Sequence, residues 1–292
     1  MPDQLIPIFG SDVWNGLDAA GKARLRQHFQ AWQLSQFLHG EQGALLCTAK
    51  IVQQVPAMDA KFYAATQVID EARHVEAYSR LLHEKFQLAY PINPHLERLL
   101  ADTLADSRWD FTYLGMQVLV EGVALAAFGL IRDQATNPLA QSVTAYVMQD
   151  EARHVAFGRL ALRDYYPQLT EKERDEREEF AVEGCYLLRD RFLGDEVWET
   201  LGLPVERCKD YVDRSDFMRM YRTSLFTRIV PTIKDIGLWG PRIRKAYADM
   251  GILGFADADM DALGQRDEEI AEGFDRRRQE IERVAGLATD AA

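Results

Sequence analysis

The pentapeptide DEARH at residues 70–74 is repeated letter for letter at residues 150–154. In each copy a glutamate stands three residues before a histidine: Glu71 before His74, and Glu151 before His154. In a helix this spacing places both side chains on one face, about one turn apart. A carboxylate and an imidazole held in this way can share one metal ion, so the two copies predict a site for two metal ions.

Two further glutamates extend the pattern. Glu41 and Glu121 each interrupt small or apolar surroundings in a helical segment, where an unpaired carboxylate is costly. Glu41 precedes Glu71 by 30 residues, Glu121 precedes Glu151 by the same 30, and the two sets lie 80 residues apart. The chain is therefore predicted to form two helical hairpins in register, each supplying a Glu and then a Glu-x-x-His, as in metal-binding four-helix bundles.

Helical periodicity dominates the chain, and glycine and proline fall mainly between the periodic segments. We predict an all-α protein. Thr170 and Glu173 form a capping-box pattern that opens a helix. The expected helices span about residues 18–54, 58–86, 95–105, 109–133, 138–166, 170–192, 205–211, 215–229 and 231–248.

No internal boundary resembles a linker, so one domain is expected over residues 1–256. Its core would cover about residues 18–166 and its accessory helices about residues 170–250. Residues 257–292 are rich in charge and are predicted to form a solvated C-terminal helix with a loose tail.

Composition excludes several function classes. The 292 residues carry a net charge of −12, which argues against nucleic acid and anionic membrane surfaces as partners. The three cysteines are far apart and form no CxxC motif, so neither a disulfide framework nor a zinc site is indicated. The first ten residues, MPDQLIPIFG, lack the pattern of a signal peptide, and we expect a cytoplasmic location.

One segment has the apolar character of a membrane span. Between residues 114 and 131 only Gln117 and Glu121 interrupt the apolar run. An ionised glutamate near the middle of a span is expensive. We therefore predict a helix buried inside the bundle and no membrane span.

With these motifs the chain resembles the ferritin-like non-haem di-iron carboxylate oxygenases and oxidases over about residues 37–166. That group includes multicomponent monooxygenase hydroxylases, acyl desaturases, ribonucleotide reductase small subunits and aminoarene N-oxygenases. The resemblance implies a ferritin-like four-helix bundle with additional C-terminal helices. It also implies the metal ligands, with one iron bound by Glu41, Glu71 and His74 and the other by Glu121, Glu151 and His154.

The resemblance also assigns roles around the ligands. Asp150 would accept a hydrogen bond from His74, and Asp70 one from His154, which would fix the orientation of each imidazole. Arg73 and Arg153 match the hydroxylase pattern and would offset the negative charge of the site, although exposed helix arginines fit the same positions. Tyr78, four residues after His74, has the spacing of the radical tyrosine in ribonucleotide reductase small subunits and is a possible redox residue, or a packing residue.

Two positions depart from these relatives. The aminoarene N-oxygenases carry an extra histidine ligand four residues before the second Glu-x-x-His, where this chain has Val147. This departure predicts that the chain stands apart from that group. The multicomponent hydroxylases place a threonine where this chain has Leu125, which predicts a more apolar pocket.

The function that follows from the resemblance is an O₂-activating di-iron oxygenase of the monooxygenase, N-oxygenase or desaturase type, acting on a small organic substrate. It would use two Fe ions, with O₂ as co-substrate and electrons from a reductase or ferredoxin, and we expect a homodimer. Two alternatives stay open. One is a ferroxidase or other iron-handling protein, and the other is an oxidase similar to ribonucleotide reductase small subunits that binds a ligand beside a Mn/Fe centre.

Overall fold

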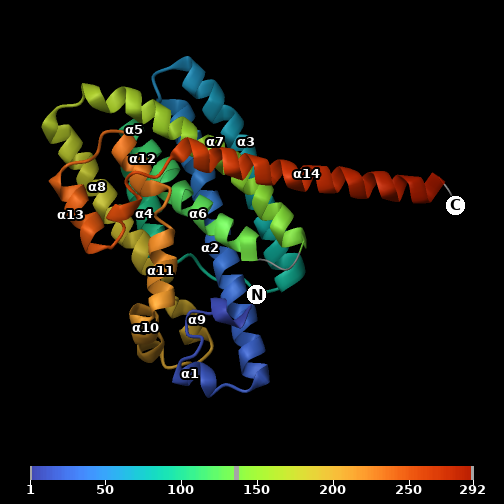
Figure 1. Ribbon diagram of the computed structural model, residues 1–292. Coiled ribbons are helices and arrows are strands. Elements are labelled where there is room, and N and C mark those ends of the chain that lie inside the picture. The colour runs from blue at the N-terminus through green and yellow to red at the C-terminus, as the bar shows by residue number, and fades with distance from the viewer. Residues whose placement is uncertain (1, 135–137, 291–292) are drawn as a thin grey trace.

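The computed structural model describes residues 2–134 and 138–290, and within these ranges every regular element is a helix. Four long helices form the core (Figure 1). They are α2 (Ala19–Gln54), α3 (Met58–Arg80), α6 (Glu121–Gln134) and α7 (Pro138–Tyr165). The all-α fold and the four-helix bundle with additional C-terminal helices are thus confirmed.

Local signals set the limits of the first hairpin. The Asp18 side chain accepts a hydrogen bond from the backbone N–H of Gly21 at 2.7 Å and so caps the start of α2. Val55, the residue before Pro56, ends that helix in extended backbone, and α3 begins three residues later. The short connection makes α2 and α3 antiparallel neighbours, which places Glu41 beside His74.

The second hairpin begins with an unusually apolar segment. It runs without interruption through α5 (Trp109–Thr112), the π-helix η3 (Tyr113–Val120) and α6. Residues 109–134 form a helix long and apolar enough to cross a membrane, with a mean hydropathy of 1.9 over the most apolar 18 residues, but 72% of that stretch is buried inside the fold. The prediction of a buried bundle helix agrees with this position at the centre of the protein.

Shorter helices surround the core. At the N-terminus and between the core helices lie η1 (Asp3–Leu5), α1 (Asp12–Asn15), η2 (Leu81–Phe86) and α4 (Pro94–Ala105). After the core come η4 (Tyr166–Gln168), α8 (Glu171–Asp190), η5 (Arg191–Leu193), α9 (Asp195–Thr200), α10 (Val205–Arg214), α11 (Asp216–Ser224), α12 (Ile229–Asp235), α13 (Pro241–Asp249), η6 (Leu253–Phe255) and α14 (Met260–Asp290).

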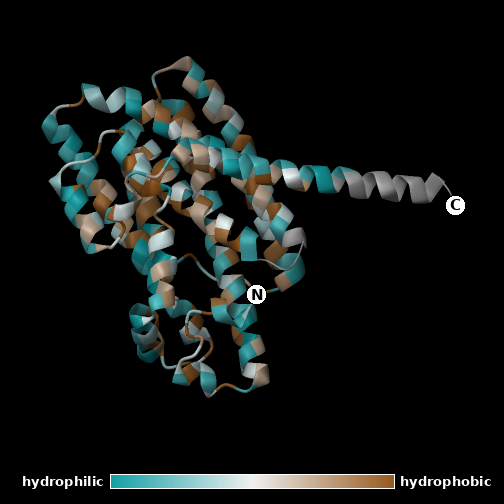
Figure 2. Ribbon diagram, in the orientation of Figure 1, coloured by the Kyte–Doolittle hydropathy of each residue, from teal (hydrophilic) through white to brown (hydrophobic). Residues whose placement is uncertain are grey.

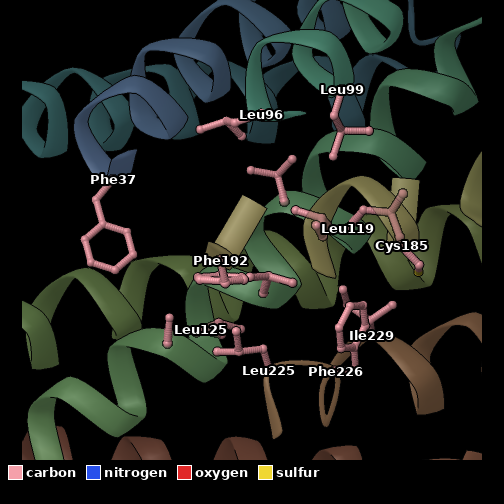
Figure 3. Close-up of a cluster of buried hydrophobic side chains, with 14 of the residues drawn as sticks. Phe37, Leu96, Leu99, Leu119, Leu125, Cys185, Phe192, Leu225, Phe226 and Ile229 are labelled. Carbon is pink, nitrogen blue, oxygen red and sulfur yellow. The ribbon is translucent and has the colours of Figure 1, made fainter. Parts of the chain in front are cut away.

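The accessory helices share one hydrophobic core with the bundle. Phe192, Leu225 and Ile229 from the accessory segment belong to the same buried cluster as Leu119 and Leu125 of the central apolar segment (Figure 3). Full burial of each such side chain contributes about 1.5–3 kcal/mol relative to leaving it exposed. The accessory helices are therefore packed onto the bundle rather than appended to it.

Helix α14 has two different halves. Its first half packs against α7, where Ala271 is buried and Asp267 forms ion pairs with Arg132 and Arg228. The helix then extends away from the bundle in Figure 1, and its described residues are largely hydrophilic in Figure 2. The charged terminal helix was predicted, but its attachment through a buried aspartate was not.

Two helix predictions in the accessory region were wrong. The single helix expected over residues 231–248 is two helices, α12 and α13. Gly237 adopts φ of +88°, a conformation that favours glycine and ends α12, and Pro241 then starts α13. The helix expected over residues 215–229 is shorter, because α11 ends at Ser224.

Candidate metal centre

The six predicted ligands converge at the centre of the bundle. Each core helix contributes: α2 gives Glu41, α3 gives Glu71, and α6 begins with Glu121. Helix α7 gives Glu151, and all four glutamates are buried, with exposed fractions between 0% and 6%. The two histidines of the repeated pentapeptides are equally buried, at 4% for His74 and 1% for His154.

These side chains form two overlapping groups. The first contains Glu41 and His74, the second contains Glu121 and His154, and both contain Glu71 and Glu151. Within each group one ligand atom from every residue lies within 4.8 Å of the others. Two adjacent groups with two shared carboxylates have the geometry of a dinuclear site in which Glu71 and Glu151 reach both positions.

Each imidazole has one nitrogen directed into the cluster and one directed out of it. Nδ1 of His74 lies 3.1 Å from Glu151, and Nδ1 of His154 lies 3.2 Å from Glu71. Nε2 of His74 lies 3.2 Å from Asp150, and Nε2 of His154 lies 3.3 Å from Asp70. The structure therefore brings together the two Asp–His pairs, each aspartate coming from the opposite hairpin.

An amide network holds two of the carboxylates. The Nε2 group of Gln67 donates hydrogen bonds to Glu71 at 3.0 Å and to Glu121 at 3.1 Å. Gln117 in turn donates to the Oε1 atom of Gln67 at 2.8 Å. The backbone of α7 leaves room for this network because Gly158 faces Gln117, where a Cβ atom would lie 2.4 Å from Oε1 of Gln117.

Several buried acceptors of the cluster have no hydrogen-bond donor in the described parts of the chain. These atoms are Oε2 of Glu71, Oε2 of Glu121 and both side-chain oxygens of Glu151. Nδ1 of His154 is equally without a hydrogen bond there. Buried polar atoms are rarely left in this state, and a cation at the cluster would satisfy all of them. The donor set, with four carboxylates and two imidazoles, fits two first-row transition-metal ions.

The ionisation of the carboxylates shows how strongly they are crowded. Burial and the neighbouring Glu151 raise the pKa of Glu41 and of Glu121 well above the usual range of glutamate. Burial also acts to raise the pKa of Glu71, but the imidazoles of His154 and His74, which lie within 3.2 and 3.6 Å of its carboxylate, outweigh it and lower that pKa to about 2. The cluster thus contains more negative charge than the two imidazoles can balance.

The two arginines of the repeat lie at the surface. The side chains of Arg73 and Arg153 are 61% and 53% exposed. Arg73 forms ion pairs with Asp70 and Asp150, and Arg153 forms one with Asp150. The arginines therefore balance the aspartates behind the histidines and do not contact the buried glutamates.

Tyr78 lies next to the cluster and is 3% exposed. Its ring stacks on Phe128 with centroids 6.1 Å apart and lies 5.9 Å from Phe37. Its hydroxyl has no hydrogen-bond partner in the described residues, and burial raises its pKa well above the usual value. The aromatic stack accounts for a packing role of Tyr78, and a redox role stays a prediction.

A small cavity of about 30 Å³ adjoins the carboxylates. Three glutamates of the cluster line it: Glu41, Glu121 and Glu151. Two polar residues outside the cluster, Gln36 and Arg191, also face it. The remaining wall is apolar and is formed by Phe37, Gly40, Ala44, Met116, Val120, Ala124 and Phe128.

Sequence reasoning assigned no role in the site to four polar residues of this region: Gln36, Gln67, Gln117 and Arg191. Gln67 stands four residues before Glu71, a spacing that places both on one helix face and that could have identified it. Gln117 has the same relation to Glu121. Arg191 lies 37 residues after His154 in an accessory segment, so no spacing rule could have identified it.

Comparison with known families gives one match. A family model described as P-aminobenzoate N-oxygenase AurF matches residues 1–237. A search of curated proteins found no match. The prediction that Val147 sets the chain apart from the aminoarene N-oxygenases is corrected by the family match, and Val147, which is 5% exposed, is buried on α7 one turn before Glu151.

Proposed function

The chain belongs to the P-aminobenzoate N-oxygenase AurF family and is a di-iron oxygenase, and from this premise we propose that it oxidises the nitrogen of a small aromatic amine. The observation that carries the proposal is the match to the P-aminobenzoate N-oxygenase AurF family, and the small cavity beside the buried carboxylates marks where a substrate nitrogen would approach them. The cavity is compact and has aromatic side chains, Phe37 and Phe128, in its wall.

The residues proposed to hold the metal ions are the six of the cluster. Glu41 and His74 would serve one ion, Glu121 and His154 the other, and Glu71 and Glu151 both. The unpartnered carboxylate oxygens and the inward-facing Nδ1 atoms support this assignment. Four carboxylates favour iron over softer metals, and a Mn/Fe pair would use the same donors.

The bound iron would supply the activation of O₂ and the oxidising power of the reaction. The protein's own residues set the conditions around it. Asp70 and Asp150 fix the orientation of the imidazoles by accepting hydrogen bonds from their Nε2 atoms. Gln67 holds Glu71 and Glu121 in place, and the apolar cavity wall limits the access of water to the substrate nitrogen.

The proposal extends to partners and setting. Reduction of O₂ at such a site requires two electrons per turnover from outside, so a reductase or ferredoxin is proposed as the electron donor. We further propose a homodimer located in the cytoplasm, and the net charge of −12 disfavours binding to anionic membranes. The iron-handling alternative is not better supported, because the matched family is described as an N-oxygenase.

Product analysis tests the proposed reaction. The iron-loaded protein is reduced chemically and exposed to O₂ with a panel of anilines, phenols and fatty acids. We expect the anilines alone to be oxidised, to hydroxylamine, nitroso or nitro compounds that mass spectrometry identifies. Oxidation of ring carbons or of fatty acids, with the anilines unchanged, would contradict N-oxygenation.

A further inference from the structure

A continuous row of aromatic rings lies beside the metal cluster. The rings of Tyr63 on α3 and Phe157 on α7 stack with centroids 3.9 Å apart, and the ring of Tyr113 on η3 lies 5.9 Å from that of Phe157. Trp109 of α5 lies 5.5 Å from Tyr113 and 4.8 Å from Tyr165, the last residue of α7. None of these centroid separations exceeds the distance of about 7 Å at which aromatic rings are in direct contact.

The row begins about one helical turn from the amide network of the cluster. Tyr63 stands four residues before Gln67, whose amide holds two of the cluster carboxylates. Phe157 stands three residues after His154. Burial raises the pKa of Tyr63, and the charges of the site also reach its ring, because His154 acts to lower that pKa and Glu121 acts to raise it.

Both ends of the row reach solvent, whereas its middle does not. Tyr113 is 0% exposed, and its hydroxyl has no hydrogen-bond partner among the described residues. Tyr63, at the cluster end, and Trp109 and Tyr165, at the far end, are partly exposed. A phenol loses an electron readily only if its proton can leave as well, while an indole loses an electron without that requirement. Tyr63 can therefore release its proton to water, and Trp109 can act as the next electron donor.

Tyr78, the tyrosine that its spacing from His74 made a redox candidate, has different surroundings. The rings in contact with it among the described residues are Phe37 and Phe128, and a benzene ring is far harder to oxidise than a phenol or an indole. Its buried hydroxyl has no hydrogen-bond partner there that would accept its proton. These contacts make Tyr63 the better electron donor of the two tyrosines.

From this arrangement we infer a second function of the oxygenase: Tyr63, Tyr113 and Trp109 supply electrons to the oxidised metal centre when no substrate occupies the cavity. Tyr63 gives one electron to the centre and its phenolic proton to water, and it becomes a neutral radical. Trp109 then returns one electron through Tyr113, and water returns the proton. A small one-electron reductant in solution, such as ascorbate, finally reduces Trp109. The inference rests on the oxidising centre and is independent of the amine proposed as substrate.

Electron paramagnetic resonance tests the inference, because it detects an organic radical whether or not a product forms. The iron(II)-loaded protein is mixed with O₂ without a substrate and frozen during the first turnover. We expect a radical signal whose line shape changes in protein grown with ring-deuterated tyrosine. Tyr63→Phe should lose this signal. Trp109→Phe should give a stronger signal that decays more slowly, because the electron that refills Tyr63 is missing.

Trp239→Phe is the matched control for Trp109→Phe. Trp239 is also partly exposed and also contacts a tyrosine ring, that of Tyr247, with centroids 6.0 Å apart, but it lies between α12 and α13 and belongs to no ring contact of the row. Its variant should reproduce the signal and the decay of the wild type, and so should Tyr78→Phe. Phenylalanine keeps a ring at each position and removes the oxidisable group, so the iron content of all four variants should stay at about two per chain.

The outcomes separate this inference from the proposed function. Absence of a radical in the wild type, a full signal in Tyr63→Phe, loss of the signal in Tyr78→Phe, or equal decay in wild type and Trp109→Phe overturns the inference. If the radical depends on Tyr63 and Trp109 but anilines are not oxidised at nitrogen, the inference stands and the proposed function fails. If anilines are oxidised at nitrogen and no radical depends on Tyr63, the function stands and the inference fails.

Discussion

At the scale of single residues, Glu71 and Glu151 have equivalent places in the two hairpins. Glu71 lies 3.2 Å from Nδ1 of His154 and 3.6 Å from Nδ1 of His74, whereas Glu151 lies closer to His74, at 3.1 Å, than to His154, at 3.6 Å. Each shared carboxylate is thus nearer to the imidazole of the other hairpin. These contacts between the two hairpins join the two Glu-x-x-His turns into one site.

Glu71 belongs to both ligand groups and Glu41 to one, so we expect their variants to lose different amounts of iron. Glu71→Gln should bring the iron content well below one per chain, from about two in the wild type, because it removes a charged ligand from both positions. Glu41→Gln should lose about one iron, because Glu41 belongs to one group only. Elemental analysis of reconstituted protein measures both. Glu76→Gln is the control, because Glu76 lies on the same helix with its side chain 72% exposed, and it should keep the full iron content. If Glu71→Gln also kept its full iron content, Glu71 would not be a metal ligand.

The two aspartates that contact the histidines, Asp70 and Asp150, should affect how tightly iron binds, but iron should still bind without them. Asp150→Asn leaves an uncharged partner for Nε2 of His74, and we expect iron to bind about 10- to 100-fold more weakly. Competition with a chelator of known affinity measures the change. Asp175→Asn, which alters a surface ion pair with Arg242, serves as the control and should leave the affinity unaltered. Equal affinities for wild type and Asp150→Asn would show that the pair has no influence on the metal.

The residues of this site differ in how far the sequence could reveal them. The three-residue spacing, the apolar surroundings of Glu41 and Glu121 and the matched intervals of 30 and 80 residues together predicted the convergence of the six cluster residues. Arg191 could not be predicted in this way. It reaches the cavity through the packing of α8 on the bundle, and that packing depends on many side chains without a short sequence signature.

At the scale of helices, the sequence pattern did not predict the type of helix that precedes Glu121. A period of 3.6 residues predicted a helix over residues 109–133, but residues 113–120 form a π-helix. Gly115 packs against Thr103 of α4 so closely that a Cβ atom would lie 2.2 Å from Oγ1 of Thr103. π-Helical turns are frequent at functional sites, and this one delivers Gln117 and Glu121 to the cluster.

Gly158 of α7 packs against Gln117 of the π-helix η3, and a substitution at Gly158 can test this contact. In Gly158→Ala the new Cβ would lie 2.4 Å from Oε1 and 2.7 Å from Cβ of Gln117, so Gln117 must move and release Gln67. We expect a loss of about 1–3 kcal/mol in the free energy of unfolding and a changed electronic spectrum of the iron-loaded protein.

Gly129→Ala is the control for that variant. A Cβ at Gly129 would meet only Cε of Met148, at 3.6 Å, and alanine favours a helix. Its stability should be unchanged or up to about 1 kcal/mol higher, with an unaltered spectrum. If Gly158→Ala behaves like Gly129→Ala in denaturant titrations, the amide network does not depend on this close approach.

At the scale of the whole molecule, bundle and accessory helices form one continuous core, which determines how the thiols react. Cys47, Cys185 and Cys208 are each 0% exposed, and burial raises the pKa of Cys47 and of Cys185 to about 12. An ordinary thiol, with a pKa of about 8.5, becomes more reactive between about pH 7 and about pH 9. The native protein should show almost no reaction with a disulfide reagent across that range and rapid reaction in denaturant. A fast phase in native protein would contradict burial of the thiols.

The attachment of α14 gives the last prediction. Asp267 is 7% exposed and lies between Arg132 of α6 and Arg228, which directly precedes α12, so one carboxylate neutralises two buried cations from different parts of the chain. Removing one partner of a buried ion pair costs about 3–5 kcal/mol, because the remaining charge stays without compensation. Asp267→Ala should therefore lower the free energy of unfolding by about that amount in urea titrations.

Glu269→Ala, at an exposed position of the same helix, is the control and should change the free energy of unfolding by less than about 0.5 kcal/mol. Iron-loaded Asp267→Ala that remains folded should keep its metal content, since Asp267 lies outside both ligand groups. A stability loss no larger than that of Glu269→Ala would mean that the first half of α14 is not anchored through Asp267, and that the bundle and its accessory helices are stable without it.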